Sequence, residues 1–134
     1  DDLTQGLAAR FRKRAWRLPL MLTRLQRTWK QHESTMRHYD VLLSPVLAHV
    51  TPPLGYISPE VPFDLLFQRM MGYINFTPIN NANGSPAIAL PVGQSDTGLP
   101  IAAQFTAAHG AERTLLELAF EIEQSRPWRR ISDG

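Results

Sequence analysis

Because this sequence contains no cysteine, nucleophilic or metal chemistry would have to use oxygen or nitrogen groups, and serine hydroxyls and histidine rings are the first to consider. A serine nucleophile needs a neighbouring base, yet none of the seven serines lies in a Gly-x-Ser-x-Gly elbow or a Ser-x-x-Lys pair. Ser44 ends a short apolar run, a position where α/β sheets often present functional groups, but a strand-ending Ser-Pro turn is the simpler interpretation. The serines therefore identify no catalytic residue.

The four histidines do not predict a metal site. His32 and His38 are six positions apart, so a helix directs them to different faces, and the spacings of three or four that align two ligands do not occur. The lack of cysteine also excludes thiolate zinc and iron–sulfur sites. We expect hydrogen-bonded or exposed histidines, no metal and no cofactor.

Positive charge is concentrated at the start of the chain. Residues 1–38 contain nine Lys or Arg and three Asp or Glu, whereas residues 39–134 contain five and nine. Together with Trp16 and Trp29, these basic residues are compatible with an autonomous module that binds nucleic acid or an anionic membrane. Trp29 lies on an apolar helical stripe, however, so packing explains it more simply. We expect no specific nucleic-acid partner, and no stretch approaches the roughly 18 apolar residues of a membrane span.

The basic region, residues 1–38, is expected to be helical. Apolar residues spaced by three or four predict a helix over 4–17 and a second helix that ends near His38. Pro19 either kinks one long helix or lies in the first turn of a new one. Glu33 is expected to form a weak surface ion pair with the arginine four residues later.

Three short apolar runs predict strands that are buried on both faces, at residues 41–46, 86–92 and 101–106. Loops rich in Pro, Gly and Ser follow them, and further helices are expected over 61–73, 77–83 and 112–125. Strands covered by helices on two faces indicate an α/β architecture. The chain has the size of one domain, but a three-stranded sheet leaves two open edges. We therefore interpret residues 1–134 as one incomplete segment, with a helical region (1–38) and a region of strands with a closing helix (39–134).

Two motifs have a recognisable pattern. Residues 39–45 read Tyr-Asp-Val-Leu-Leu-Ser-Pro, in which an aromatic residue and an aspartate precede a short buried strand. Further along, Asn81, Gly84 and Pro86 form an Asn-x-x-Gly-x-Pro motif that leads directly into the next apolar run.

A third motif comprises residues 98–101 (Gly-Leu-Pro-Ile) with Gln104, followed by residues 112–116 at the opening of the last helix. In order and spacing, the three motifs resemble the C-terminal third of the amidase signature family of serine amidohydrolases. The resemblance extends over about residues 39–128, whereas residues 1–38 resemble the family only in being helical.

The resemblance implies that the intact protein hydrolyses carboxylic amides with a serine nucleophile, a second serine on a cis peptide bond and an unprotonated lysine. In the family these residues lie in a Gly/Ser-rich core upstream of the matched region, and no Gly-Gly-Ser-Ser-Gly-Gly run occurs here. The chain would then contain no catalytic residue and be inactive alone. It would supply strands, the closing helix and part of the pocket for a small-molecule amide, against the upstream part of the same enzyme. We expect this enzyme to be cytoplasmic.

Within the matched region, Phe76, Asn80 and Asn81 are the residues expected to line or support the pocket. An amide side chain at a junction between loop and helix can meet a substrate carbonyl or buttress a catalytic loop. Alternatively, Asn81 caps the backbone near Gly84 and never meets substrate. Two other functions also stay open: the basic binding module, and a scaffold that forms a homo-oligomer through its exposed sheet edges.

Overall fold

The helical region of the computed structural model, which describes residues 2–128, consists of two helices joined by a tight turn. Helix α1 (Asp2–Arg12) is followed by one 3-10 turn, η1 (Ala15–Arg17), and by the long helix α2 (Leu18–Met36). Of the two roles predicted for Pro19, the structure shows the second, because Pro19 lies in the first turn of α2, where its missing N–H leaves no hydrogen bond unmade.

The sheet has three strands, β1 (Leu42–Pro45), β2 (Ala87–Gln94) and β3 (Pro100–Thr106). Their order is β1-β3-β2, and β3 pairs antiparallel with both neighbours. A tight turn joins β2 to β3, in which the Gly98 N–H donates to the Ser95 carbonyl at 2.9 Å. Gly98 has a φ of +82°, a conformation that favours glycine. The predicted neighbouring strands and their turn are confirmed.

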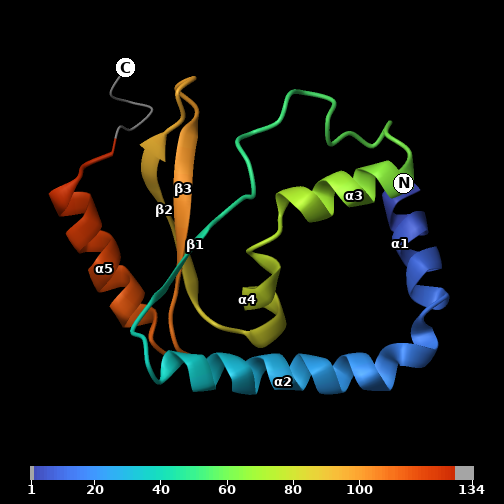
Figure 1. The fold of residues 1–134 in the computed structure, drawn as a ribbon, viewed down its shortest axis with the longest axis horizontal. Coiled ribbons are helices and arrows are strands. Elements are labelled where there is room, and N and C mark those ends of the chain that lie inside the picture. Colours follow the sequence, from blue (N-terminus) through green and yellow to red (C-terminus); the bar gives the residue numbers. More distant parts are fainter. Residues whose placement is uncertain (1, 129–134) are drawn as a thin grey trace.

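The remaining helices are α3 (Phe63–Tyr73), α4 (Pro78–Asn83) and α5 (Glu112–Ser125). In Figure 1, α5 lies on one side of the sheet and the short α4 lies on the other, which confirms the predicted α/β architecture with flanking helices. Helix α5 packs against β2, its buried residue is Leu115, and Ala111 begins it without a side-chain cap.

The prediction that the strands are buried on both faces is wrong for this chain. Burial alternates along β1, where Leu43 is 68% exposed. The register places Leu43, Phe105 and Ile88 on one face of the sheet, and Ser44 and Gln104 on the other. Helix α5 packs against β2 and α4 is bonded to β3 through Asn80, whereas no helix within residues 2–128 packs extensively on β1.

The apolar core is small for a chain of this length. Five hydrophobic residues among those described are buried: Met36, Leu66, Leu90, Ala107 and Leu115. The accessible surface is 10288 Å², whereas a compact monomer of 15.2 kDa has about 7,100 Å². The stripe predicted for α2 remains half-exposed, with Leu22 at 51% and Trp29 at 48%.

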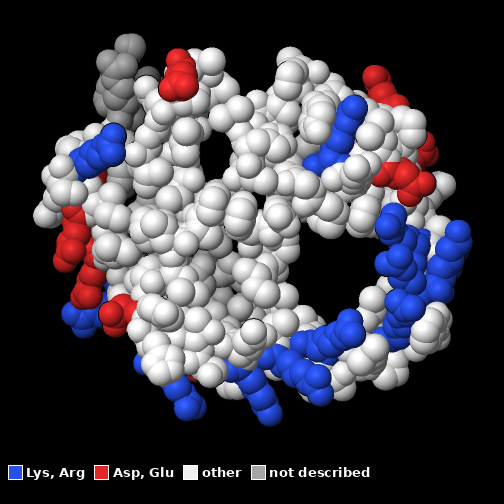
Figure 2. Space-filling view, viewed as in Figure 1, with Lys and Arg blue, Asp and Glu red and all other residues white. Residues whose placement is uncertain are grey.

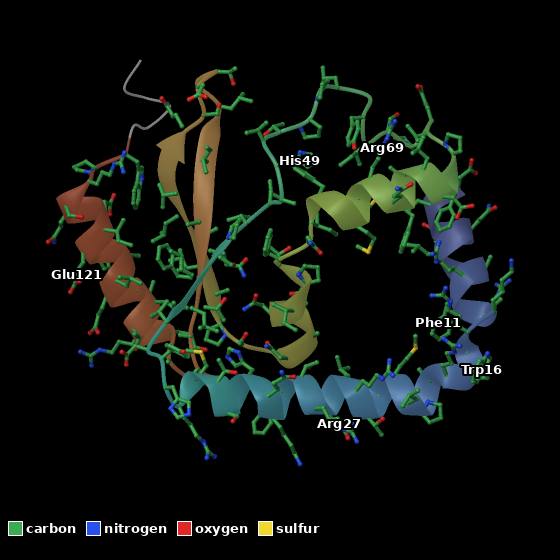
Figure 3. All side chains as sticks on the ribbon, viewed as in Figure 1. Phe11, Trp16, Arg27, His49, Arg69 and Glu121 are labelled. Atoms are coloured by element: carbon green, nitrogen blue, oxygen red, sulfur yellow. The ribbon has the colours of Figure 1, made fainter. Side chains whose placement is uncertain are left out.

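Helices α1, α2, α3 and α4 form an open frame rather than a filled layer (Figure 1). Figure 2 shows that an opening remains inside this frame when all side chains are drawn, and that Lys and Arg gather along α1 and α2 while acidic residues gather on α5. Phe11 and Trp16 lie at the corner where α1 meets α2 (Figure 3). No helix described in the structure is long and apolar enough to cross a membrane.

The frame is closed by contacts between α1 and α3. Arg10 lies 3.5 Å from Asp64 and 4.4 Å from the centre of the Phe67 ring. Gly6 faces the ring of Phe63 so closely that a Cβ would lie 2.2 Å from it, so any larger residue would force the ring or the helix to shift.

Candidate functional site

A cluster of polar side chains joins α4 to the face of the sheet, and we call it the Asn80 cluster (Asn80, Asn83, Ser85, Gln104 and Thr106). The Asn80 amide nitrogen donates to Ser85 Oγ at 2.9 Å and to Thr106 Oγ1 at 3.0 Å. Its oxygen accepts from Gln104 Nε2 at 2.7 Å. Asn80 therefore connects α4 to β3 and to the segment that enters β2.

The local sequence explains why α4 turns back toward the sheet at this point. Pro78 is in the first turn of α4, and Gly84 ends it with a φ of +75°, a left-handed conformation that suits glycine. The Gly84 N–H donates to the Asn80 carbonyl at 2.8 Å. Asn83 Oδ1 then accepts the Ser85 N–H at 2.9 Å and the Ser85 hydroxyl at 2.7 Å.

These contacts determine what the Asn80 cluster can do chemically. The Ser85 hydroxyl donates to an amide oxygen and accepts from an amide nitrogen, so it has no base that could activate it as a nucleophile. Among the described residues, no fully buried side-chain nitrogen or oxygen lacks a partner. The cluster holds α4 in place and contains no reactive group.

His109 lies in the loop between β3 and α5, and its ring contacts both α2 and α4. Its Nδ1 lies 2.5 Å from Glu33 Oε1 on α2, and its Nε2 lies 2.7 Å from the Asn83 carbonyl at the end of α4. The hydrogen bond to Glu33 and then that to Asn83 raise the pKa of His109, and His109 in turn lowers the pKa of Glu33. The prediction that Glu33 pairs with Arg37 is wrong, because Glu33 is turned toward His109.

The three residues predicted for the pocket occupy different environments. Phe76 is half-buried just before α4, and Asn80 is the centre of its cluster. Asn81 is exposed, and its side chain makes no hydrogen bond within the described part of the chain. The residue that caps the backbone beside Gly84 is Asn83.

Gln104 and His109 are the two residues bonded to α4 that the sequence did not single out as its partners. Gln104 is a buried polar residue inside an apolar strand, which is a signal that a hydrogen-bonding partner lies opposite. His109 gives no comparable signal, because its two acceptors are 76 and 26 residues away along the chain.

A groove of about 320 Å³ lies at the end of β1, lined mainly by apolar residues and by His49. The His49 ring packs 4.8 Å from that of Tyr73 and its Nδ1 is bonded to the Val50 carbonyl. Arg69 lies nearby on α3, over the Tyr56 ring (Figure 3). Within the described residues, no three His, Asp or Glu side chains converge as metal ligands.

Comparison with known proteins decides the family. The model of the amidase family matches residues 3–116. The chain belongs to the amidase family. The match starts 36 residues before the first predicted motif, at residue 39. The prediction that residues 1–38 share only helicity with the family is therefore wrong.

Relatives within the amidase family are several times longer than this chain. "Putative amidase AmiC" of Mycobacterium leprae is 44% identical over 134 residues, which are 100% of this chain and 28% of that protein. The 6-aminohexanoate-cyclic-dimer hydrolase of Paenarthrobacter ureafaciens is 34% identical over 67% of this chain and 20% of its own length. This chain is thus a C-terminal portion of an amidase.

Solved structures agree with this assignment. A 6-aminohexanoate cyclic dimer hydrolase superposes with a TM-score of 0.67 at 30% identity, over 79% of this chain and 24% of that one. A glutamyl-tRNA(Gln) amidotransferase subunit from Thermotoga maritima gives 0.68 over 95% of this chain and 27% of that one, and at 20% identity it supports the fold alone. These matches give no support to an autonomous basic module or a scaffold.

Proposed function

We propose that the amidase to which this chain belongs hydrolyses the carbon–nitrogen bond of a small carboxylic amide. The observation that carries the proposal is the family match over residues 3–116. It is supported by two relatives named 6-aminohexanoate-cyclic-dimer hydrolase, which match two thirds of this chain.

The reaction would use groups outside this chain. A serine attacks the amide carbonyl, backbone N–H groups hold the oxyanion, the amine or ammonia leaves, and water then releases the acid from the acyl-enzyme. The family's base is a lysine, but Lys13 and Lys30 lie in the basic region and not in the Asn80 cluster. This segment alone is therefore expected to be inactive.

The role of this chain is to complete the framework and one wall of the pocket. Its surface exceeds that of a compact monomer by almost half, and the exposed α2 stripe and the outer face of β1 are suited to packing against the rest of the enzyme. Phe76 lies just before α4, and Asn80 and Asn81 lie within it. We assign the three residues to the pocket wall. Cytoplasmic location and a homo-oligomer stay predictions.

A chimera provides the test. The matching portion of the M. leprae relative is replaced by this chain, and release of ammonia or amine from acetamide and from para-nitroacetanilide is measured. The chain alone and the unmodified relative are assayed in parallel. We expect turnover by the chimera and none by the chain.

One result would refute the proposal, and another would refute the expectation that this chain is inactive alone. The first is a chimera that folds, as judged by circular dichroism and gel filtration, but hydrolyses neither amide while the unmodified relative does. The other is turnover by the 134-residue chain itself, which would place the catalytic groups within it.

A further inference from the structure

One imidazole ring joins three elements that carry the candidate pocket wall. His109 lies between β3 and α5, and its two ring nitrogens contact Glu33 of α2 at 2.5 Å and the Asn83 carbonyl of α4 at 2.7 Å. Both contacts are with oxygens that only accept hydrogen bonds when Glu33 is ionised. A neutral imidazole has one N–H, so only the protonated ring satisfies both contacts.

The surroundings of His109 favour this protonated form. Glu33 and His32 face it from α2, and Glu112 is the charged group that acts on it from α5. His32 is itself engaged, since its Nε2 bonds to the Ala107 carbonyl at 3.0 Å. The Trp29 ring lies 5.5 Å away and limits access to the ring from that side.

We propose that His109 is a positioning residue: when it is protonated it bridges the C-terminal end of α4 to α2, in addition to the direct packing of these helices. When it is neutral, one half of this bridge is lost. Asn83 connects this bridge to the rest of the Asn80 cluster, because Asn83 Oδ1 accepts from the Ser85 hydroxyl and Ser85 Oγ accepts from the Asn80 amide nitrogen. Loss of the proton to solvent removes one of the two N–H donors. The carbonyl of Asn83 or the carboxylate of Glu33 then faces a lone pair, so the bridge through His109 is broken, and only the direct packing between α4 and α2 remains.

An effect of His109 on substrate binding rests on the proposed function, but the bridge from His109 to α2 and α4 does not. We therefore propose two readouts on the full-length amidase. The first is nuclear magnetic resonance of protein labelled with ¹⁵N-asparagine, in which the side-chain amide signals of Asn80 and Asn83 are followed against pH. We expect them to shift with the same midpoint as the His109 ring.

The second readout is the pH dependence of KM and kcat for para-nitroacetanilide. We expect KM to rise about fivefold as His109 loses its proton, the effect of one lost hydrogen bond, with a smaller change in kcat. His109→Gln keeps one N–H donor but does not titrate, so its KM should be high and lack this step. His38→Gln, at an exposed position beyond α2, is the matched control and should behave as the wild type.

The outcomes separate the two proposals. If the Asn80 and Asn83 signals stay constant while His109 titrates, or if wild type and His109→Gln share one KM profile, the bridge is refuted. If those signals follow His109 but no amide is hydrolysed at any pH, the bridge is supported and the proposed function is refuted. Because the first readout uses wild-type protein, it decides the matter even if a variant does not fold.

Discussion

Asn80 on α4 and Gln104 on β3 lie 24 residues apart in the chain and meet through a hydrogen bond of 2.7 Å. Gln104 is buried in the middle of the sheet, so its amide needs a partner, and Asn80 provides one while it donates to two hydroxyls. This pair fixes the distance between the candidate pocket wall and the sheet.

Replacing Asn80 should therefore destabilise the protein. Asn80→Ala removes three hydrogen bonds and leaves Gln104 without an acceptor, at an expected cost of about 1–3 kcal/mol in the free energy of unfolding. Urea unfolding of the full-length amidase measures this cost. Asn81→Ala, at the neighbouring exposed position, should change the free energy by less than about 0.5 kcal/mol. Equal effects of the two substitutions would contradict the role of Asn80.

The Glu33–His109 pair should make stability depend on pH in two directions. The raised pKa of His109 stabilises the fold fully below about pH 6.5, the unfolded value, and this contribution disappears as pH rises through the folded pKa. The lowered pKa of Glu33 stabilises it above the ordinary carboxyl range, and this contribution disappears as pH falls through the folded pKa. Urea midpoints of wild type and Glu33→Gln should differ most between these limits and converge at both ends. A constant difference would argue against the pair.

Two glycines offer a matched test of the turn after α4. Gly84 has a φ of +75°, and a Cβ there would meet only His109 Nε2 at 3.7 Å, so Gly84→Ala should cost about 1 kcal/mol through backbone strain alone. Gly72 lies within α3 with open space around it, and Gly72→Ala should stabilise by about 0.5–1 kcal/mol. Thermal unfolding of both variants checks the opposite signs. Destabilisation by both substitutions would mean that the space beside Gly72 in α3 is filled in the full-length protein.

Substitutions in the exposed apolar stripe of α2 test whether the rest of the amidase covers this helix. Leu22 and Leu25 are 51% and 45% exposed in this chain. If the rest of the amidase covers them, Leu22→Ala and Leu25→Ala should each cost about 2–5 kcal/mol in the full-length protein, as in a core. Arg27→Ala on the same helix is the control and should be nearly neutral. Near-neutral effects at both leucines would show that the stripe remains in water.

Most helix and strand positions could be predicted from the sequence, because they depend on local patterns. The exception is the helix predicted over 4–17, which ends at Arg12 and is followed by a 3-10 turn. Pro78 and Gly84 mark the two ends of α4, and the expected range of 77–83 agrees with the observed Pro78–Asn83. The period of apolar residues placed α5 correctly over Glu112–Ser125. These signals act within a few residues, so they can be recognised without knowing the tertiary structure.

Long-range partners and burial could not be predicted in the same way. Glu33 has Arg37 within reach of one helical turn, yet it pairs with His109, which only the fold brings close. Leu43 is apolar as a buried strand requires, but its exposure depends on which element lies over it. For the candidate site, Asn80 could be named from its place between loop and helix. That Gln104 is its partner could not be predicted, because this depends on how β3 is placed in the sheet.

The small set of five buried apolar side chains also bears on how the protein is made. A ribosome releases the C-terminal portion of a chain last, and domains generally fold as units during synthesis. A portion with so little interior of its own gains order chiefly by docking onto residues that have already emerged. Translation that stops before this portion would leave the earlier part with an uncovered apolar face, which is a ready target for chaperones and proteases.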